Sequence, residues 1–403
     1  DLLQEQVILK PGEYFNPIKA QSDLSRFYNT GVINSATYNV VRDSSGDIKV
    51  QYIIEENPVI ESIEITGNSV FIDYTLTSRM ETKVGEILDN EKLRRDIKMI
   101  ETLYHDNEYI MARVKEVDRP NTSDKKKVLS IIISEVRVGQ ISIKGNKNTK
   151  DFTILREMEM KPGLVFDRDM LQSDLRNVYN LNYFKTVYPD VKPSLLNEED
   201  IDIVLNVEEK KTNSINFGGG YGQLDGWFGF IDLFLDNLWG EGQSALLKAQ
   251  MGQLRNTYQL RYTNPWAFPD HTAFTGKIWS TYGYSYLGNY IEQRGGWDLG
   301  LSKPLSRHVQ GSVHVIYEDV SFPGGYEQDG KQISPEYRRG VGGALAYDTR
   351  DYIMNPTQGD YHVFRLDKLA TWFGGTVDSW KYGVSFEKFF PLEKIDKKNF
   401  KQK

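Results

Sequence analysis

The sequence predicts an α+β region of β-α-α-β-β repeats followed by an antiparallel transmembrane β-barrel. The first of three observations behind this prediction is self-similarity. Lys161-Pro162-Gly163 repeats Lys10-Pro11-Gly12, and Gln172-Ser173-Asp174-Leu175 repeats Gln21-Ser22-Asp23-Leu24, both 151 residues further along the chain. The second is composition, because all seven tryptophans and all but eight of the 34 glycines follow residue 211. The third is a change of hydrophobic period from 3.6 to 2 at the same point.

A third copy of the unit lies between the other two. Ile63-Glu64-Ile65-Thr66-Gly67-Asn68 matches Ile141-Ser142-Ile143-Lys144-Gly145-Asn146, 78 residues further on, and the same spacing relates Asp96 to Asp174. Each unit ends in an acidic strand, at Glu55-Glu56, Glu135 and Glu208-Glu209. These repeats predict a partial domain at 1–57, complete domains at 58–136 and 137–210, and a barrel portion at 211–403.

The middle unit shows the order of elements most completely. A strand over 60–66 ends at the turn signal Gly67-Asn68, and a short helix is predicted over 71–80. After Gly85, Asp89 is the expected cap of a second helix, and strands at 109–117 and 128–136 complete the unit. The helix spacing predicts that Leu93 and Ile97, with Leu171 and Leu175 of the third unit, are buried under a three-stranded sheet. The first unit is too short for an opening strand, so we expect the chain to begin inside a unit.

Residues 211–403 predict about ten long amphipathic strands, which fit a barrel wall with one face toward lipid and one toward a wet lumen. The expected ranges are 213–221, 227–235, 243–252, 256–264, 272–284, 289–303, 308–320, 336–350, 359–371 and 378–390. We expect six apolar residues to face lipid: Leu247, Leu260, Val313, Val315, Val384 and Phe386. Four charged residues should face the lumen: Lys248, Arg261, Glu318 and Glu387. Trp239, Trp266 and Phe268, at strand ends, are predicted for an aromatic girdle. The alternative is a soluble β-sandwich, which strands of this length disfavour.

Several classes of function find no support in the composition. A net charge of −7 and a single short basic run, Lys125-Lys126-Lys127, argue against nucleic-acid binding. The chain has no cysteine, and its five histidines are dispersed, so no metal site is expected. Neither a nucleophile elbow nor a phosphate loop is present, and we predict no catalytic residues, no cofactor and no enzymatic activity.

The β-α-α-β-β unit, with one glycine after its first strand and another between its helices, resembles the POTRA domain over residues 1–210. Glu208-Glu209-Lys210-Lys211 with the glycine-rich stretch after Ile215 resembles the entry to the first barrel strand of BamA-type outer-membrane assembly proteins. Asn237-Leu238-Trp239-Gly240-Glu241-Gly242, Asn264-Pro265-Trp266 and Tyr347-Asp348-Thr349-Arg350-Asp351 resemble later turns of that barrel. The family barrel has sixteen strands, so the resemblance implies an incomplete barrel of about ten, cut near the polar residues 393–398.

The resemblance implies an insertase that folds β-barrel proteins into the outer membrane, with its POTRA domains in the periplasm. Its implied partners are unfolded outer-membrane proteins, accessory periplasmic lipoproteins and membrane lipid. Client strands would add to exposed POTRA edges, at Thr37, Tyr38, Asn39 and Val40 and at Val187, Tyr188, Asp190 and Val191. A weak first barrel strand would act as a lateral gate, formed by Ile215, Asn216, Phe217, Gly218, Gly219, Gly220 and Tyr221. Alternatively, these glycines only let an aromatic side chain of a neighbouring strand pack closely.

Three other functions remain open at this point. A polypeptide secretion or import transporter shares the fold, although two-partner exporters usually carry two POTRA units rather than three. A passive porin-like channel would leave the repeats without a role. A soluble peptide-binding scaffold would need no membrane.

Overall fold

The computed structural model describes residues 3–43, 46–121, 123–197, 199–285, 290–325, 327–328 and 331–391. Residues 393–398, where a polar end was expected, lie outside these ranges. The chain forms two compact units. The first unit contains residues 1–141, 160–172 and 191–203, and the second contains 142–159, 173–190 and 204–403. The last repeat therefore contributes segments to both units.

The first repeat is a small helix-and-hairpin module. It contains a 3-10 turn (η1, Gln4–Gln6), the helix α1 (Pro17–Tyr28) and two antiparallel strands, β1 (Ile33–Arg42) and β2 (Ile48–Glu56). Asn16 caps α1 by accepting hydrogen bonds from the backbone N–H groups of Ile18 and Lys19. Its core consists of Leu24, Phe27, Ile33 and Ala36.

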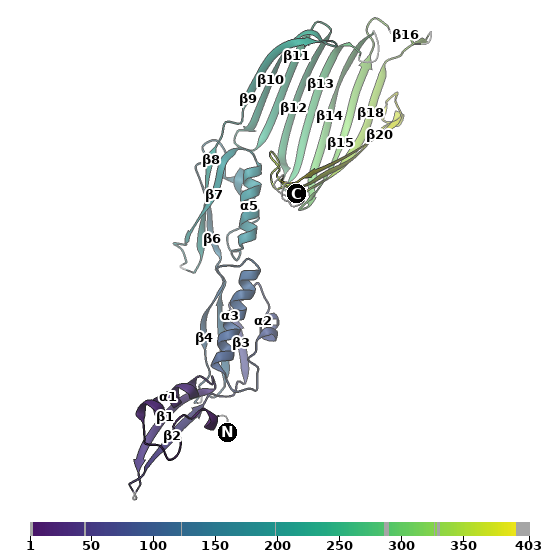
Figure 1. Ribbon diagram of the computed structural model, residues 1–403. Coiled ribbons are helices and arrows are strands. Elements are labelled where there is room, and N and C mark those ends of the chain that lie inside the picture. The colour runs from purple at the N-terminus through teal and green to yellow at the C-terminus, as the bar shows by residue number, and fades with distance from the viewer. Residues whose placement is uncertain are drawn as a thin grey trace, which may run out of the picture. The chain divides into compact units, whose positions relative to one another are not determined.

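The second and third repeats both show the predicted β-α-α-β-β order (Figure 1). The second contains β3 (Ser62–Thr66), α2 (Asp73–Arg79), α3 (Asn90–Asp106), β4 (Arg113–Asp118) and β5 (Val128–Ser134), with sheet order β3-β5-β4. The third contains β6 (Val138–Lys144), α4 (Asp151–Leu155), α5 (Arg168–Asn180), β7 (Phe184–Pro193) and β8 (Ile201–Glu209), with sheet order β6-β8-β7. In both repeats the strand that comes first in the sequence pairs with the strand that comes last. The strand between them in the sequence, β4 or β7, pairs only with the last strand and lies at an edge of the sheet.

The buried faces of the long helices correct part of the sequence prediction. Leu93 and Leu171 are buried as expected, but Ile97 and Leu175 are only half-buried. The fully buried residues one position earlier are Asp96 and Asp174. A spacing rule that counts only apolar residues misses them, because carboxylates are rarely buried unless they are hydrogen-bonded.

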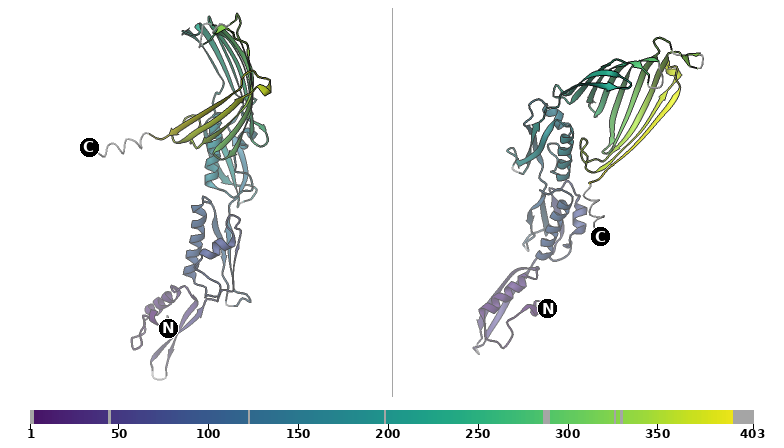
Figure 2. Two further views of the ribbon diagram at one scale, coloured as in Figure 1. Left: turned by 90° about the vertical axis from the view of Figure 1, so that its right-hand side faces the viewer. Right: turned by 45° about the horizontal axis from the view of Figure 1, so that its top comes forward.

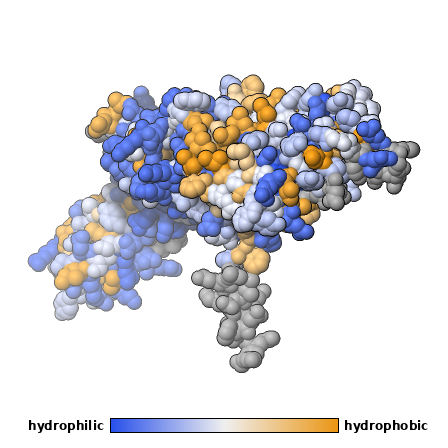
Figure 3. Space-filling view, turned by 90° about the horizontal axis from the view of Figure 1, so that it is seen from above, coloured by the Kyte–Doolittle hydropathy of each residue, from blue (hydrophilic) through white to orange (hydrophobic). Residues whose placement is uncertain are grey.

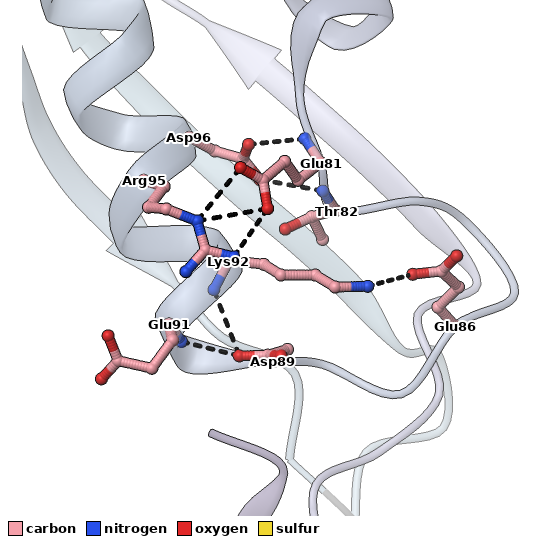
Figure 4. Close-up of polar contacts among 8 residues, drawn as sticks. All are labelled: Glu81, Thr82, Glu86, Asp89, Glu91, Lys92, Arg95 and Asp96. Atoms are coloured by element: carbon pink, nitrogen blue, oxygen red, sulfur yellow. Dashed lines mark hydrogen bonds and ion pairs between the residues drawn. The ribbon is translucent and has the colours of Figure 1, made fainter. Parts of the chain in front are cut away.

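Each repeat buries one helix carboxylate that holds the loop before the helix. Asp96 accepts hydrogen bonds from the backbone N–H groups of Glu81, at 2.6 Å, and Thr82, at 3.0 Å (Figure 4). Asp23 accepts from Ile8 N–H at 2.6 Å, and Asp174 accepts from Glu159 N–H at 2.7 Å. An ionised acceptor makes these bonds stronger than neutral ones. The recurrence of Asp in the three sequence copies therefore reflects one structural role.

The acidic strand ends have a second shared role. Glu135 accepts from the N–H groups of Ser69 (2.8 Å) and Val70 (2.9 Å) and from the hydroxyl of Tyr104 (2.7 Å). Glu209 accepts from Asn148 and Thr149 N–H at 3.1 and 2.7 Å. Burial alone would raise the pKa of Glu135, but its hydrogen bonds outweigh that effect and hold its pKa below the ordinary value.

Glycine at the end of β3 and β6 is required by a close backbone approach. Gly67 and Gly145 have φ of +81° and +96°, and a Cβ on either would lie 2.0 Å from the carbonyl oxygen of Ile133 or Val207. The following Asn68 and Asn146 each donate to the backbone carbonyl three residues on, at 2.8 Å. The repeated Gly-Asn pair thus forms a turn, and no residue larger than glycine could take its first position.

The large sheet consists of ten antiparallel strands in chain order. They are β9 (Ser214–Gly222), β10 (Gly226–Leu238), β11 (Gln243–Gly252), β12 (Arg255–Phe268), β13 (Thr272–Tyr284), β14 (Ile291–Ser306), β15 (Val309–Ser321), β18 (Glu336–Asp348), β19 (Gly359–Leu369) and β20 (Ser379–Phe389). All ten predicted strands are confirmed. A short hairpin, β16 (Glu327–Gln328) and β17 (Lys331–Gln332), lies between β15 and β18, and η2 (Thr371–Phe373) lies between β19 and β20. Figure 2 shows one curved layer, and no second sheet packs on it in the described ranges, so the β-sandwich alternative is wrong.

The pairing register confirms the predicted division of the sheet into two faces. Leu247 pairs with Leu260, and the rows that continue from them place the six expected apolar residues on one face. Lys248, Arg261, Glu318 and Glu387 lie on the other face. The six apolar side chains are between 45% and 76% exposed, and apolar residues form patches over the sheet in Figure 3. In the described residues, no helix is both long and apolar enough to cross a membrane.

Replacing the buried carboxylate of the second repeat should destabilise that repeat strongly. Asp96→Ala leaves the N–H groups of Glu81 and Thr82 without their acceptor, and we expect a loss of about 3 kcal/mol. Native-state hydrogen exchange of the segment around these amides measures the loss. The control is Asp106→Ala, at the exposed end of the same helix, which should change the free energy by less than about 0.5 kcal/mol. Equal effects of the two substitutions would contradict the assigned role.

The low pKa of Glu135 predicts a pH dependence of stability. Because the folded-state pKa lies below the unfolded value, the stabilisation is present above the ordinary carboxyl pKa and is lost as the pH falls through the folded pKa. Glu135→Gln should therefore narrow the difference in unfolding free energy between neutral and acidic solution. Urea unfolding at several pH values checks this, and an unchanged pH profile would argue against it.

Candidate functional site

The three segments predicted from sequence as binding sites all lie on edge strands. Thr37, Tyr38, Asn39 and Val40 lie on β1, Val187, Tyr188, Asp190 and Val191 on β7, and residues 215–221 on β9. Each of these strands has one neighbouring strand in the described part of the chain. An edge strand offers backbone N–H and C=O groups to an added strand, so the geometry needed for strand addition is present.

On β1, the four predicted residues differ in their surroundings. Thr37, Asn39 and Val40 are exposed, whereas Tyr38 is half-buried. The ring of Tyr38 packs against those of Phe15 and Tyr52, with centroids 6.3 Å apart in both pairs. Tyr38 therefore packs against the small core of the first repeat, and its side chain is less accessible than those of the three exposed residues.

A groove of about 710 Å³ runs between α5 and β7 of the last repeat. It is lined by Leu175, Arg176, Tyr179, Asn180, Asn182, Thr186, Val187, Tyr188, Tyr352, Met354, Asn355 and Thr357. The last four belong to the loop between β18 and β19, which contacts α5 through the Tyr179 and Tyr352 rings, with centroids 5.5 Å apart. Val187 and Tyr188 thus line the groove as candidate contacts, whereas Asp190 and Val191 do not. Pro189 on this strand has no N–H, as edge strands tolerate.

The strand β9 forms one edge of the ten-stranded sheet. It pairs with β10 from Ser214↔Phe234 to Gly222↔Gly226. Ile215, Phe217 and Tyr221 share the apolar face and are 63%, 81% and 68% exposed. Asn216 lies opposite Asp232 on the other face. In the described part of the chain, this edge therefore combines backbone groups that have no strand partner with large apolar side chains.

The glycines of β9 make room for two phenyl rings of β10. A Cβ on Gly218 would lie 2.9 Å from the Phe230 ring, and one on Gly220 would lie 3.3 Å from the Phe228 ring. The close aromatic packing considered as the alternative is therefore present. The gate remains a prediction, because close packing on one face does not decide whether the edge opens.

A contact between the last repeat and the large sheet was not predicted from the sequence. The residues that form this contact all belong to the second unit. The turn at residues 237–242 is held by α4 and the residues on either side of it. Lys150 N–H donates to the carbonyl of Gly240 at 3.0 Å, and the Thr153 hydroxyl donates to the same oxygen at 2.8 Å. Arg156 donates to the carbonyl of Glu241 at 2.8 Å. The glycine-rich motif is thus a docking turn whose partners become visible only in three dimensions.

A second part of this contact corrects the girdle prediction for Trp266. Its indole N–H donates to Glu157 at 2.6 Å, and its ring stacks on His271 with centroids 4.0 Å apart. Burial lowers the pKa of His271, so the neutral ring is favoured. Trp266 therefore binds the last repeat rather than facing lipid, while Trp239 and Phe268 remain exposed at 71% and 50%.

The docking turn predicts a sharp effect of a single methyl group. A Cβ on Gly240 would lie 2.0 Å from the carbonyl oxygen of Asn148, and its φ is +74°. Gly240→Ala should break the contact and broaden the distance distribution between spin labels at Thr186 and Leu305. The matched control is Gly383→Ala, where nothing lies within 4 Å. Identical distributions in the two variants would show that the turn does not hold the repeat.

Among the described residues, no three or more His, Asp or Glu side chains are grouped so that they could hold a metal ion. Two family models match the chain. The Omp85 superfamily domain matches residues 237–403, and the POTRA model, described as a surface antigen variable number repeat, matches 58–135 and 136–210.

Curated relatives have related descriptions. A Treponema pallidum protein, named as a candidate outer membrane protein assembly factor, is 34% identical over 215 residues, covering 51% of this chain and 25% of its own. The outer membrane protein assembly factor BamA of Neorickettsia risticii is 22% identical over 314 residues, covering 77% of this chain and 40% of its own. The chain spans between a quarter and two fifths of the length of these relatives.

Solved structures share the fold. BamA from Haemophilus ducreyi lacking POTRA domains 1–3 superposes with a TM-score of 0.50 at 19% identity, covering 82% of this chain and 66% of its own. CdiB from Escherichia coli superposes with a TM-score of 0.54 at 14% identity, covering 96% of this chain and 72% of its own.

Proposed function

This chain belongs to the Omp85 superfamily, and we propose on that premise that it folds and inserts β-barrel proteins into the outer membrane. The sheet lies in that membrane and the POTRA repeats lie in the periplasm. The names of the Treponema and Neorickettsia relatives support assembly of outer-membrane proteins as the role of the whole protein.

The observation that carries the proposal is the β9 edge. Its apolar side chains face the same way as the apolar face of the sheet, and its backbone has one strand neighbour in the described residues. In lipid, an unpaired backbone N–H or C=O costs several kcal/mol, because no water is present to bind it. A client strand that pairs with β9 satisfies both chains at once, so insertion requires no nucleotide.

The groove between α5 and β7 would bind the same client before it reaches β9. An extended segment would pair with the β7 backbone while its alternate side chains enter the groove beside Tyr179 and Val187. Because the β18–β19 loop also lines the groove, a segment bound there already lies at the sheet. The proposed partners are unfolded outer-membrane proteins, membrane lipid and accessory periplasmic lipoproteins.

Two alternatives have less support. A polypeptide transporter would use the same fold, and the likeness to CdiB concerns the fold alone. The curated relatives quoted above are named for assembly, which favours the insertase. A passive channel would leave the groove and the β9 edge without a role.

Site-specific crosslinking in the full-length protein tests the proposal. A photoreactive amino acid at Phe217 or Tyr188 should capture a β-barrel client during insertion into membranes. The control position is Val315, which is 45% exposed on the same face but lies on an interior strand. Normal client insertion with no capture at Phe217, or with equal capture at Val315, would exclude β9 as the pairing edge.

A further inference from the structure

A polar cavity of about 870 Å³ lies at the root of the β9–β10 hairpin, and the groove and edges described above do not include it. Its walls are the loop between β6 and α4, the end of β8, residues 210–213 and the turn after β10. All of these segments belong to the second unit. The cavity is therefore a feature of one compact body.

Three lysines line this cavity: Lys147, Lys210 and Lys211. None of them forms an ion pair with a carboxylate in the described part of the chain, whereas nearby Lys150 and Lys185 pair with Glu241 and Glu208 at 2.6 and 2.7 Å. Lys147 and Lys211 are exposed. The Lys210 ammonium donates to Asn182 Oδ1. In the described residues, Lys147 and Lys211 are therefore the cationic groups that the cavity offers to a ligand.

The two carboxylates in the wall are engaged by backbone groups. Glu209 accepts from the N–H groups of Asn148 and Thr149, at 3.1 and 2.7 Å, and Asp236 accepts from Asn237 N–H at 3.0 Å. These bonds hold both carboxylates against the wall. An anion entering the cavity would meet the ammonium groups of Lys147 and Lys211 as its strongest available partners.

An exposed tryptophan lies beside these lysines. Trp239 lines the cavity, is 71% exposed and has a φ of +54°, unusual for a residue other than glycine. It follows directly after β10, whose Leu233 lies in the apolar row with Ile215 and Leu247. Tryptophan and lysine at the end of membrane strands are typical of the interface between lipid tails and headgroups.

We propose that this cavity binds the headgroup of an anionic phospholipid from the membrane leaflet that faces the repeats. The lipid phosphate lies between Lys147 and Lys211, and the acyl chains follow Trp239 onto the apolar face of β9 and β10. The inference rests on the proposed membrane position of the sheet but not on client insertion. A bound lipid would anchor the base of the proposed gate strand.

Binding of short-chain lipids to the full-length protein in detergent tests this site. Dihexanoyl phosphatidylglycerol is titrated and counted by native mass spectrometry, with dihexanoyl phosphatidylcholine as the zwitterionic comparison and inorganic phosphate as the free anion. We expect Lys147→Gln combined with Lys211→Gln to raise the Kd for phosphatidylglycerol about thirtyfold, as expected for two lysine contacts at an anionic surface. Lys125→Gln combined with Lys126→Gln, two exposed lysines of the second repeat, should leave the Kd unchanged.

Two further variants separate the lipid from other causes. Replacing Lys147 and Lys211 by arginine should retain binding, which shows that a loss in the glutamine variant comes from charge and not from misfolding. Trp239→Ala should weaken phosphatidylglycerol binding without changing phosphate binding. Equal affinity for the two lipids, equal affinity for free phosphate, or equal losses in the two glutamine variants would each overturn the proposal.

Discussion

Backbone N–H and C=O groups need hydrogen-bond partners, and this requirement determines both the stability and the proposed activity of this protein. Within the ten-stranded sheet the register satisfies these groups strand by strand, and the apolar row from Ile215 through Leu233 and Leu247 requires a lipid environment. At β9 the row continues but the pairing ends in the described residues. Backbone hydrogen bonds between neighbouring strands stabilise the interior of the sheet. A client strand that pairs with β9 would gain the same kind of hydrogen bond at the edge.

In the repeats, buried carboxylates supply hydrogen-bond acceptors to backbone N–H groups. Asp96 and Glu135 bind N–H groups of loops that no strand or helix could satisfy, so these loops are held in one conformation. In the last repeat this has a further consequence. Glu209 fixes the loop before α4, and the same loop presents Lys150 N–H to the carbonyl of Gly240. An interaction internal to the repeat thus shapes the surface that contacts the sheet.

The glycines of β9 allow the aromatic rings of β10 to pack closely, and they leave part of the edge strand without side chains. Gly218 and Gly220 accept the rings of Phe230 and Phe228 on the face opposite the apolar one. These aromatic contacts add to the backbone pairing between β9 and β10, while residues 218–220 contribute no side chains of their own. The strand β9 can therefore pack against β10 on one side and still offer its backbone groups to a client strand on the other side.

The sequence by itself determined the repeats, their β-α-α-β-β order and the ten strands with their two faces. These features follow from local periodicity, from Gly-Asn turns and from the spacing of recurring residues, which neighbours in sequence decide. It also placed the predicted binding segments on strands that prove to be edges. Tertiary structure alone decided that Asp96 rather than Ile97 is fully buried, because the loop amides that it binds lie far from it in sequence. The docking of Thr153 and Trp266 across the junction, and the grouping of Lys147 and Lys211 beside Trp239, likewise depend on segments that meet only after folding.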